Sequence, residues 1–400
     1  PSFMSSNTFP TKHFALLIAS LVAIGMGQSM TFAILAPLGR QVEMSELAIT
    51  TLIACSSLTF GFASPYWGRL SDRIGRRPVI LIGLVGYCFG TTAFASIFIL
   101  GINGTLSGAG LFASLLVARC LHAAIMSATG PSTTAYAADH TTPEKRTKTM
   151  AKLGTATSMG MILGPAFAGA TATFGLMAPL YAAAVLALIM AVLVWKIIPT
   201  TPPSDRQPRH NALKLRYSDS RIWPFVIIAI GTFMGFAGVQ QTLGFFLQDQ
   251  LELTGVRTAQ LTGIAMLTSA SFTLVIQTTV MQWVNLQPGQ FIKIGLGLIS
   301  AGALVIASSN NFVLIALGMG VMGMGVGCTM PSIISATSLA VAPHEQGAAA
   351  GMIAGCPAIG FGIGPVGAGY LYQIDPHYPH LASALFVGLM LVALLLSRKL

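Results

Sequence analysis

The chain has 400 residues, of which 54% are hydrophobic and only 8% are charged. Soluble domains carry about 25% charged residues, so this composition excludes an ordinary soluble enzyme or binding domain and indicates an integral membrane protein. The net charge of +10 does not indicate a nucleic-acid-binding surface, because the basic residues stand in short stretches between apolar segments.

The apolar segments fall into two groups of six, each segment long enough to cross about 30 Å of hydrocarbon. The first group covers 14–38, 47–67, 78–100, 109–138, 147–175 and 178–198. The second group covers 222–248, 258–284, 290–307, 312–342, 347–371 and 380–397. We therefore predict an all-α membrane protein with twelve transmembrane helices in two six-helix bundles, 1–198 and 222–400, joined by a polar cytoplasmic loop at 199–221.

The lysines and arginines predict the orientation of these helices. With the N-terminus inside, only Arg40 and Arg257 of the 21 basic residues fall on the outer side and Arg119 lies within a helix, which leaves 18 on the cytoplasmic side. Because cytoplasmic loops carry the excess of Lys and Arg, we expect a multi-pass protein of the inner, or plasma, membrane with both termini in the cytoplasm.

The two halves resemble each other at an offset of 200 residues. Thr129, Pro131, Ser132 and Pro143 recur as Thr329, Pro331, Ser332 and Pro343, and Gly160, Gly164, Pro165 and Gly169 recur as Gly360, Gly364, Pro365 and Gly369. A parallel repeat of this kind predicts two pseudo-symmetric bundles around a central cavity, with the substrate near the midplane.

The run from Gly68 to Pro78 is the most specific motif. It places four arginines, one carboxylate and two glycines between two apolar segments, and Gly75 permits a tight reversal. This run resembles the loop between helices 2 and 3 of the major facilitator superfamily, Gly-x-Leu-Ala-Asp-Arg-x-Gly-Arg-Arg/Lys, with Ser71 in place of Ala. The resemblance covers nearly the whole chain, although the second half has no good copy of the loop.

The resemblance implies a gating role for the charged loops. Asp72 would meet the N-terminal end of helix 11 near Gln346 and complement its dipole, and the alternative is a solvated loop acid. A second loop, with an acid followed seven residues later by an arginine, also resembles the superfamily. The implied gating set is Gly68, Asp72, Arg73, Arg76, Asp139 and Arg146.

Small residues four apart in helix 5 allow close helix packing, and the proline allows a kink. These residues are Gly160, Gly164, Pro165 and Gly169. Spacing alone is compatible with generic packing. However, the sequence resembles the helix-5 signature of facilitator antiporters, which exchange substrate for protons, and this resemblance favours an antiporter over a symporter or uniporter.

Arg119 is a charge predicted to lie within the membrane, where an ionisable residue is a functional hypothesis by default. The antiporter pattern Arg-x-x-Gln-Gly is matched only in part, because His122 and Ala123 replace Gln and Gly. His122 lies three residues from Arg119 on nearly the same helix face and could titrate near neutral pH. For Arg119 a structural role remains an alternative, and for His122 a hydrogen-bonded packing role is as well supported as proton carriage.

None of the 11 acidic residues is predicted to lie at mid-membrane, and helix 1 offers Gln28 and Ser29 where many multidrug antiporters carry an acid. A cavity with Arg119 but no carboxylate should favour anionic or zwitterionic substrates. Gln240 and Gln241 in helix 7 could line the same cavity, although ordinary packing is an alternative for both.

Together these features predict a secondary active transporter that works by alternating access. We expect a proton-coupled antiporter that exports a small organic compound, either a drug or an anionic metabolite such as a carboxylate siderophore. The alternatives are an importer of small organic anions or siderophores, a receptor without flux, and, more remotely, a membrane enzyme. We expect no enzyme activity, cofactor, metal site or nucleic-acid partner, and a monomer whose partners are the substrate, protons and the lipid bilayer.

Overall fold

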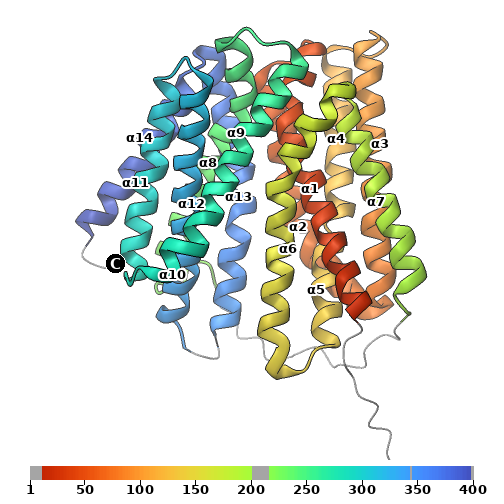
Figure 1. Ribbon diagram of the computed structural model, residues 1–400, viewed down its shortest axis with the longest axis vertical. Coiled ribbons are helices and arrows are strands. Elements are labelled where there is room, and N and C mark those ends of the chain that lie inside the picture. Colours follow the sequence, from red (N-terminus) through yellow and green to blue (C-terminus); the bar gives the residue numbers. More distant parts are fainter. Residues whose placement is uncertain (1–10, 201–215, 343–344, 398–400) are drawn as a thin grey trace, which may run out of the picture. The chain divides into compact units, whose positions relative to one another are not determined.

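The computed structural model describes residues 11–200, 216–342 and 345–397, and these residues are almost entirely helical (Figure 1). The helices of the first half are α1 (Thr11–Gln41), α2 (Glu46–Ile74), α3 (Arg76–Ile102), α4 (Gly108–Met126), α5 (Thr129–Asp139), α6 (Pro143–Thr171), the short 3₁₀ helix η1 (Ala172–Phe174) and α7 (Ala178–Ile197).

The helices of the second half follow the same order. They are α8 (Trp223–Gln250), α9 (Gly255–Val275), the π-helix η2 (Ile276–Val280), α10 (Met281–Trp283), α11 (Pro288–Ala307), α12 (Phe312–Ala340), α13 (Gln346–Ile374) and α14 (Tyr378–Leu396). Two predicted spans are interrupted, since α4 and α5 form the fourth, and α9, η2 and α10 form the eighth. The predicted twelve-helix fold is confirmed.

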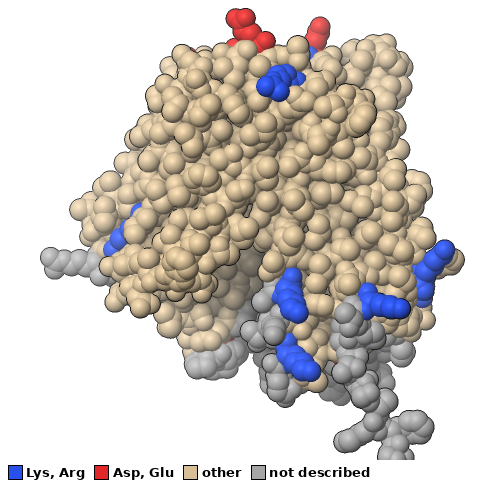
Figure 2. All heavy atoms as spheres, viewed as in Figure 1, with Lys and Arg blue, Asp and Glu red and all other residues tan. Residues whose placement is uncertain are grey.

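Eleven helices in the described residues are long and apolar enough to cross a membrane. The fifth predicted span is the exception. It corresponds to α6, whose 29 residues are sufficient in length but begin with basic residues and continue through Thr, Ser and Gly. On the face shown in Figure 2, charged side chains lie at the top and in the lower half, and a broad surface between them shows no charged residue.

By contacts, the chain divides into two compact units. The first consists of Pro1–Thr31 with Thr59–Arg206, and the second of Phe32–Leu58 with Gln207–Leu400. Helices α1 and α2 therefore contribute to both units. The sequence-based domain boundaries remain a prediction, and most of the predicted central loop lies outside the described residues.

The packing of glycines follows the 200-residue repeat. In the first unit, a Cβ on Gly160 of α6 would lie 2.5 Å from the Val22 carbonyl oxygen of α1. In the second unit, a Cβ on Gly360 of α13 would lie 3.0 Å from the Ile230 carbonyl oxygen of α8. The repeated glycines thus allow the same close approach between equivalent helix pairs.

The break between α4 and α5 lies at Ser127 and Ala128. Pro131 has no N–H to offer the carbonyl four residues earlier, which weakens the helix there. The Ala124 carbonyl accepts hydrogen bonds from Trp67 Nε1 at 2.6 Å and from Ser127 Oγ at 2.8 Å. Pro331, at the equivalent position, lies inside the continuous helix α12, so proline alone does not determine the break.

Local sequence signals account for several helix ends. Gly75, the one residue between α2 and α3, has φ of 95°, which favours glycine and confirms the predicted tight reversal. Proline occupies the first turn of α6, α7, α8, α11 and α14, where its missing N–H costs nothing. Asn311 caps α12 by accepting a hydrogen bond from the Val313 N–H at 2.8 Å.

Candidate functional site

Arg119 and His122 form a hydrogen-bonded pair on α4, buried within the first unit. Arg119 Nη1 lies 3.2 Å from His122 Nδ1, and His122 Nε2 lies 3.3 Å from Thr91 Oγ1 of α3. Only 6% of Arg119 and 2% of His122 are exposed. The imidazole therefore bridges the guanidinium to the hydroxyl of the neighbouring helix.

Aromatic rings of α3 complete the surroundings of this pair. The Arg119 guanidinium carbon lies 5.6 Å from the centre of the Phe94 ring, a cation–π distance. The Tyr87 ring lies 4.8 Å from the His122 ring at an interplanar angle of 66°. Gly90 makes this contact possible, because a Cβ there would lie 2.8 Å from the His122 Cβ.

The charge of Arg119 has no acidic partner within the part of the chain that the structure describes. Its Nε is buried and makes no hydrogen bond. Removing a charge from water is costly unless it is paired. The Phe94 ring and His122 offset only part of this cost.

The other predicted substrate contacts are divided between the units. Gln28 is half-buried on α1 in the first unit. Gln240 and Gln241 lie on α8 in the second unit, where the Gln240 Oε1 and the Gln241 Nε2 are buried without a hydrogen-bond partner. The assembly of these three side chains with Arg119 and His122 into one site remains a prediction.

Arg76, the first residue of α3, is the centre of the charged segment where α2 meets α3. Its guanidinium lies 2.6 Å from Asp72 Oδ1 and 3.0 Å from Asp139 Oδ2, and it donates a hydrogen bond of 2.7 Å to Ser71 Oγ. Gly68 faces Pro131 of α5, with 3.7 Å between its position for a Cβ and the proline Cβ. These contacts join α2, α3 and α5 at the predicted cytoplasmic side of the first unit.

The remaining gating predictions are not tested. Arg73 is exposed at the end of α2. The backbone of Arg146 belongs to α6, but its side chain lies outside the described residues. Asp72 lies in the first unit and Gln346 in the second, so their contact remains a prediction, as does a gating role for the whole set.

The helix-5 motif packs α6 against α1. A Cβ on Gly164 would lie 2.0 Å from Ser29 Oγ and 2.3 Å from the Met26 carbonyl oxygen. Ser29 Oγ donates a hydrogen bond of 3.3 Å to the Gly160 carbonyl oxygen. Pro165 lies within α6, and Gly169 is buried near its end. The motif thus has a packing role in the structure, whatever its part in proton exchange.

Comparison with known proteins identifies the family. The family model described as Major Facilitator Superfamily matches residues 17–365 and 288–399. The chain belongs to the major facilitator superfamily. It is 28% identical to Multidrug resistance protein 1 of Bacillus subtilis over 373 residues, which cover 91% of this chain and 90% of that protein. It is also 31% identical to the class C tetracycline resistance protein of Escherichia coli over 192 residues, 47% of this chain and 45% of the relative.

Solved structures show the same superfamily fold. The nucleoside transporter NupG superposes with a TM-score of 0.78 at 15% identity, covering 97% of this chain and 100% of the other. The human organic anion transporter MFSD10 gives a TM-score of 0.66 at 18% identity, covering 96% and 99%. These structures confirm the predicted fold, the family match confirms the predicted superfamily, and the curated relatives point to its drug:proton antiporter branch.

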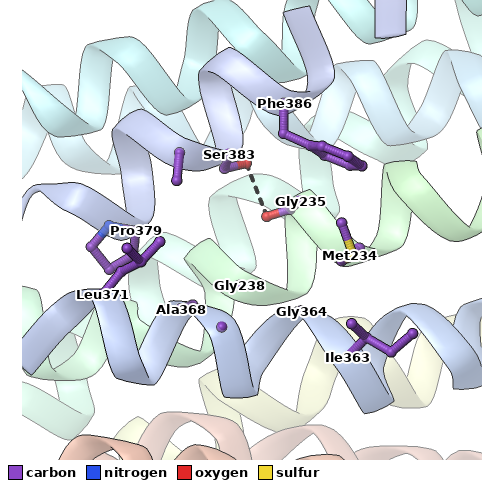
Figure 3. A pocket seen from close by; sticks show the side chains of 12 residues that line it. Met234, Gly235, Gly238, Ile363, Gly364, Ala368, Leu371, Pro379, Ser383 and Phe386 are labelled. Atoms are coloured by element: carbon purple, nitrogen blue, oxygen red, sulfur yellow. Dashed lines mark hydrogen bonds between the residues drawn. The ribbon is translucent and has the colours of Figure 1, made fainter. Parts of the chain in front are cut away.

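The second unit contains a pocket of about 320 Å³ between α8, α13 and α14 (Figure 3). Its lining is apolar apart from Ser383, whose Oγ donates a hydrogen bond of 3.0 Å to the Gly235 carbonyl oxygen. Met234, Ile363 and Phe386 supply much of its wall. None of the predicted substrate-binding residues lines it, and it offers no charged side chain for an anion.

Two groups of residues that contact charged side chains were missed by the sequence analysis. Tyr87, Thr91 and Phe94 surround Arg119 and His122, and their spacing of four and three residues along α3 is a signal that could have identified them. Arg40 pairs with Asp249, 209 residues away, and no local pattern in the sequence indicates that pairing.

Proposed function

We propose that this protein exports a small organic anion in exchange for protons. The observation that supports the anion most directly is the buried guanidinium of Arg119, which has no acidic partner among the described residues. A bound carboxylate would supply the missing counter-charge with charge-assisted hydrogen bonds. Unpartnered amide groups of Gln240 and Gln241 support a substrate that also carries hydrogen-bonding groups, such as a hydroxycarboxylate.

The direction of transport is supported by the relatives. Two curated relatives that cover more than 90% of this chain are named for multidrug resistance, and a shorter match is named for tetracycline resistance. We therefore assign efflux from the cytoplasm across the inner membrane by a monomer with both termini inside. The two units would alternate access to the substrate by rocking.

His122 supports a second candidate, import of the anion together with protons. Arg119 can only donate hydrogen bonds, so protonation of His122 requires Arg119 to release Nδ1. An anion that draws Arg119 away would free this nitrogen, and a protonated imidazole would in turn attract the anion. Binding of the proton and binding of the anion would then each increase the affinity for the other. Such positive coupling is required for cotransport, whereas exchange requires negative coupling.

Flux in proteoliposomes with an imposed pH gradient tests these candidates. A tricarboxylate and a lipophilic cation such as tetraphenylphosphonium are offered in parallel, with the Arg119→Ala variant as control. Movement of the tricarboxylate against the proton flow supports the proposed exporter, and movement with the protons supports the importer. Movement of the cation alone contradicts an anion site at Arg119.

A further inference from the structure

Four side chains meet at the predicted outer ends of α1, α2, α8 and α13. Arg40, in the last turn of α1, lies 2.7 Å from Glu46 Oε1 at the start of α2 and 2.8 Å from Asp249 Oδ2 at the end of α8. Tyr372 of α13 donates a hydrogen bond of 2.7 Å to the same Asp249 oxygen. All four residues belong to the second unit.

Aromatic rings pack against this cluster. The Arg40 guanidinium carbon lies 5.4 Å from the centre of the Phe245 ring, and that ring lies 5.9 Å from the Tyr372 ring. The side chains of Arg40 and Asp249 are each 35% exposed, while Glu46 is 11% exposed. The ion pairs are therefore partly shielded from water, which makes them stronger than fully exposed pairs.

Tight packing continues along the same helices. A Cβ on Gly369 of α13 would lie 2.1 Å from Thr50 Oγ1 of α2, and a Cβ on Gly244 of α8 would lie 2.7 Å from the Ala36 Cβ of α1. The Phe32 and Phe361 rings stack with their centres 6.0 Å apart. The cluster thus caps a closely packed joint rather than standing alone on the surface.

The helices that meet at this joint, α1, α2, α8 and α13, come from both halves of the sequence repeat. By the sequence repeat, α1 and α2 belong to the first half of the chain and α8 and α13 to the second. Their outer parts nevertheless pack into one unit, because α1 passes from one unit to the other at Thr31 and α2 at Leu58. Outward opening separates the two halves at this side. It must therefore break the contacts that join α1 and α2 to α8 and α13, which include the Arg40–Asp249 ion pair and the Arg40–Phe245 contact.

We propose that the Arg40–Asp249 ion pair is a latch that holds the outer side closed during the transport cycle, and that Tyr372 positions the Asp249 carboxylate for it. This inference rests on the proposed function only in that the two halves rock between states. It does not depend on which substrate is carried or on the direction of proton coupling. Loss of the latch should favour the outward-open state.

The distance between spin labels across the outer side measures the latch directly. Labels are placed at Thr105→Cys and Asn310→Cys, in exposed loops of the two units, after the five native cysteines are replaced by alanine. In Arg40→Gln we expect the population with the longer distance to rise roughly threefold to tenfold relative to the parent. Tyr372→Phe, which removes one hydrogen bond and little volume, should give a smaller rise in the same direction.

Matched controls separate the latch from a general effect of charge. Arg257→Gln removes the other predicted outer-side arginine, which donates to Gln260, and should leave the distance distribution unchanged. The double variant Arg40→Gln with Asp249→Asn should shift it no further than the stronger single variant, because both changes break the same interaction. An unchanged distribution in Arg40→Gln, an equal shift in Arg257→Gln, or additive single effects would each overturn the latch.

The measurement also separates the latch from the proposed function. It needs no substrate and no proton gradient, so the distance result stands whatever the flux assay shows. An open shift with no anion flux would retain the latch and contradict the anion exporter. Normal anion export with an unchanged distance distribution would support the anion exporter and contradict the latch.

Discussion

Arg119 and His122 are joined by a contact of 3.2 Å between Nη1 and Nδ1, in which only the arginine can donate. A guanidinium has no acceptor atom, so Nδ1 must carry the lone pair and Nε2 the proton, which points toward Thr91 Oγ1. In this arrangement the imidazole is neutral. Any step that loads a proton on His122 must therefore move Arg119, which connects the charge that would bind an anion to the group that would bind a proton.

His122→Gln separates hydrogen bonding from proton binding. The glutamine oxygen can accept from Arg119 and its amide can donate to Thr91, but the side chain cannot titrate. We expect the variant to bind substrate with little change and to lose transport driven by a pH gradient. Thr91→Val, which removes the acceptor but keeps the imidazole, should retain the gradient-driven component. Unchanged gradient-driven flux in His122→Gln would limit His122 to a bridging role.

Arg119→Ala should reduce flux to that of empty liposomes without unfolding the protein. The change removes a buried charge that has no acidic partner in the described chain, so the loss of hydrogen bonds to His122 is offset by a lower desolvation cost. Flux is measured beside the melting temperature in detergent, with Arg257→Ala as a matched arginine control. Normal flux by a well-folded Arg119→Ala protein would disprove its role in the cavity.

Hydropathy and spacing predicted the twelve helices, because each bilayer crossing requires its own apolar segment. They predicted Gly75 at the α2–α3 reversal, since a positive φ favours glycine there. They did not predict the break at Ser127, because the repeat places a proline at both 131 and 331 and only the first of these lies beside a break. They also could not pair Arg40 with Asp249, since contacts between distant helices depend on packing that no local pattern records.

Asp72→Asn should slow the transport cycle while leaving substrate binding intact. The Asp72 carboxylate is 57% exposed and lies 2.6 Å from the better buried Arg76, so its removal should cost little stability. If Asp72 stabilises one state of the cycle, as the superfamily resemblance implies, we expect flux to fall about fivefold to tenfold. Binding is followed by the quenching of tryptophan fluorescence. Loss of binding by a folded variant would contradict a purely gating role.

Asp219, which forms an ion pair of 2.8 Å with Arg221, should not contribute to the pH dependence of transport between pH 5 and 8. Hydrogen bonds from Arg221 at 2.8 Å and 3.1 Å lower the pKa of Asp219 to about 2. A lowered folded-state pKa gives a contribution that is complete above the unfolded value near 3.8 and is lost as the pH falls toward 2. Asp219→Asn should therefore leave the shape of the pH–flux profile unchanged. A displaced midpoint between pH 5 and 8 would show that Asp219 takes part in coupling.

Two glycine substitutions in α6 should have opposite effects on stability. A Cβ on Gly164 would lie 2.3 Å from the Met26 carbonyl oxygen of α1, whereas a Cβ on Gly154 would meet nothing within 4 Å. Gly164→Ala must push α6 away from α1 and should destabilise the protein by about 1–3 kcal/mol, the usual cost of overpacking. Gly154→Ala only restricts the unfolded backbone and should stabilise it by about 0.5–1 kcal/mol.

The repeat offers an internal test of the same argument. In α13, a Cβ on Gly364 would lie 2.2 Å from the Met234 carbonyl oxygen of α8, and a Cβ on Gly351 would meet nothing within 4 Å. Gly364→Ala and Gly351→Ala should therefore show the same contrast in stability that we expect for Gly164→Ala and Gly154→Ala. Melting temperatures of the four variants in one detergent give the comparison. Equal stability of Gly164→Ala and Gly154→Ala would show that α6 and α1 can separate at no cost. It would contradict the interpretation that the repeated glycines maintain the close approach of these helices.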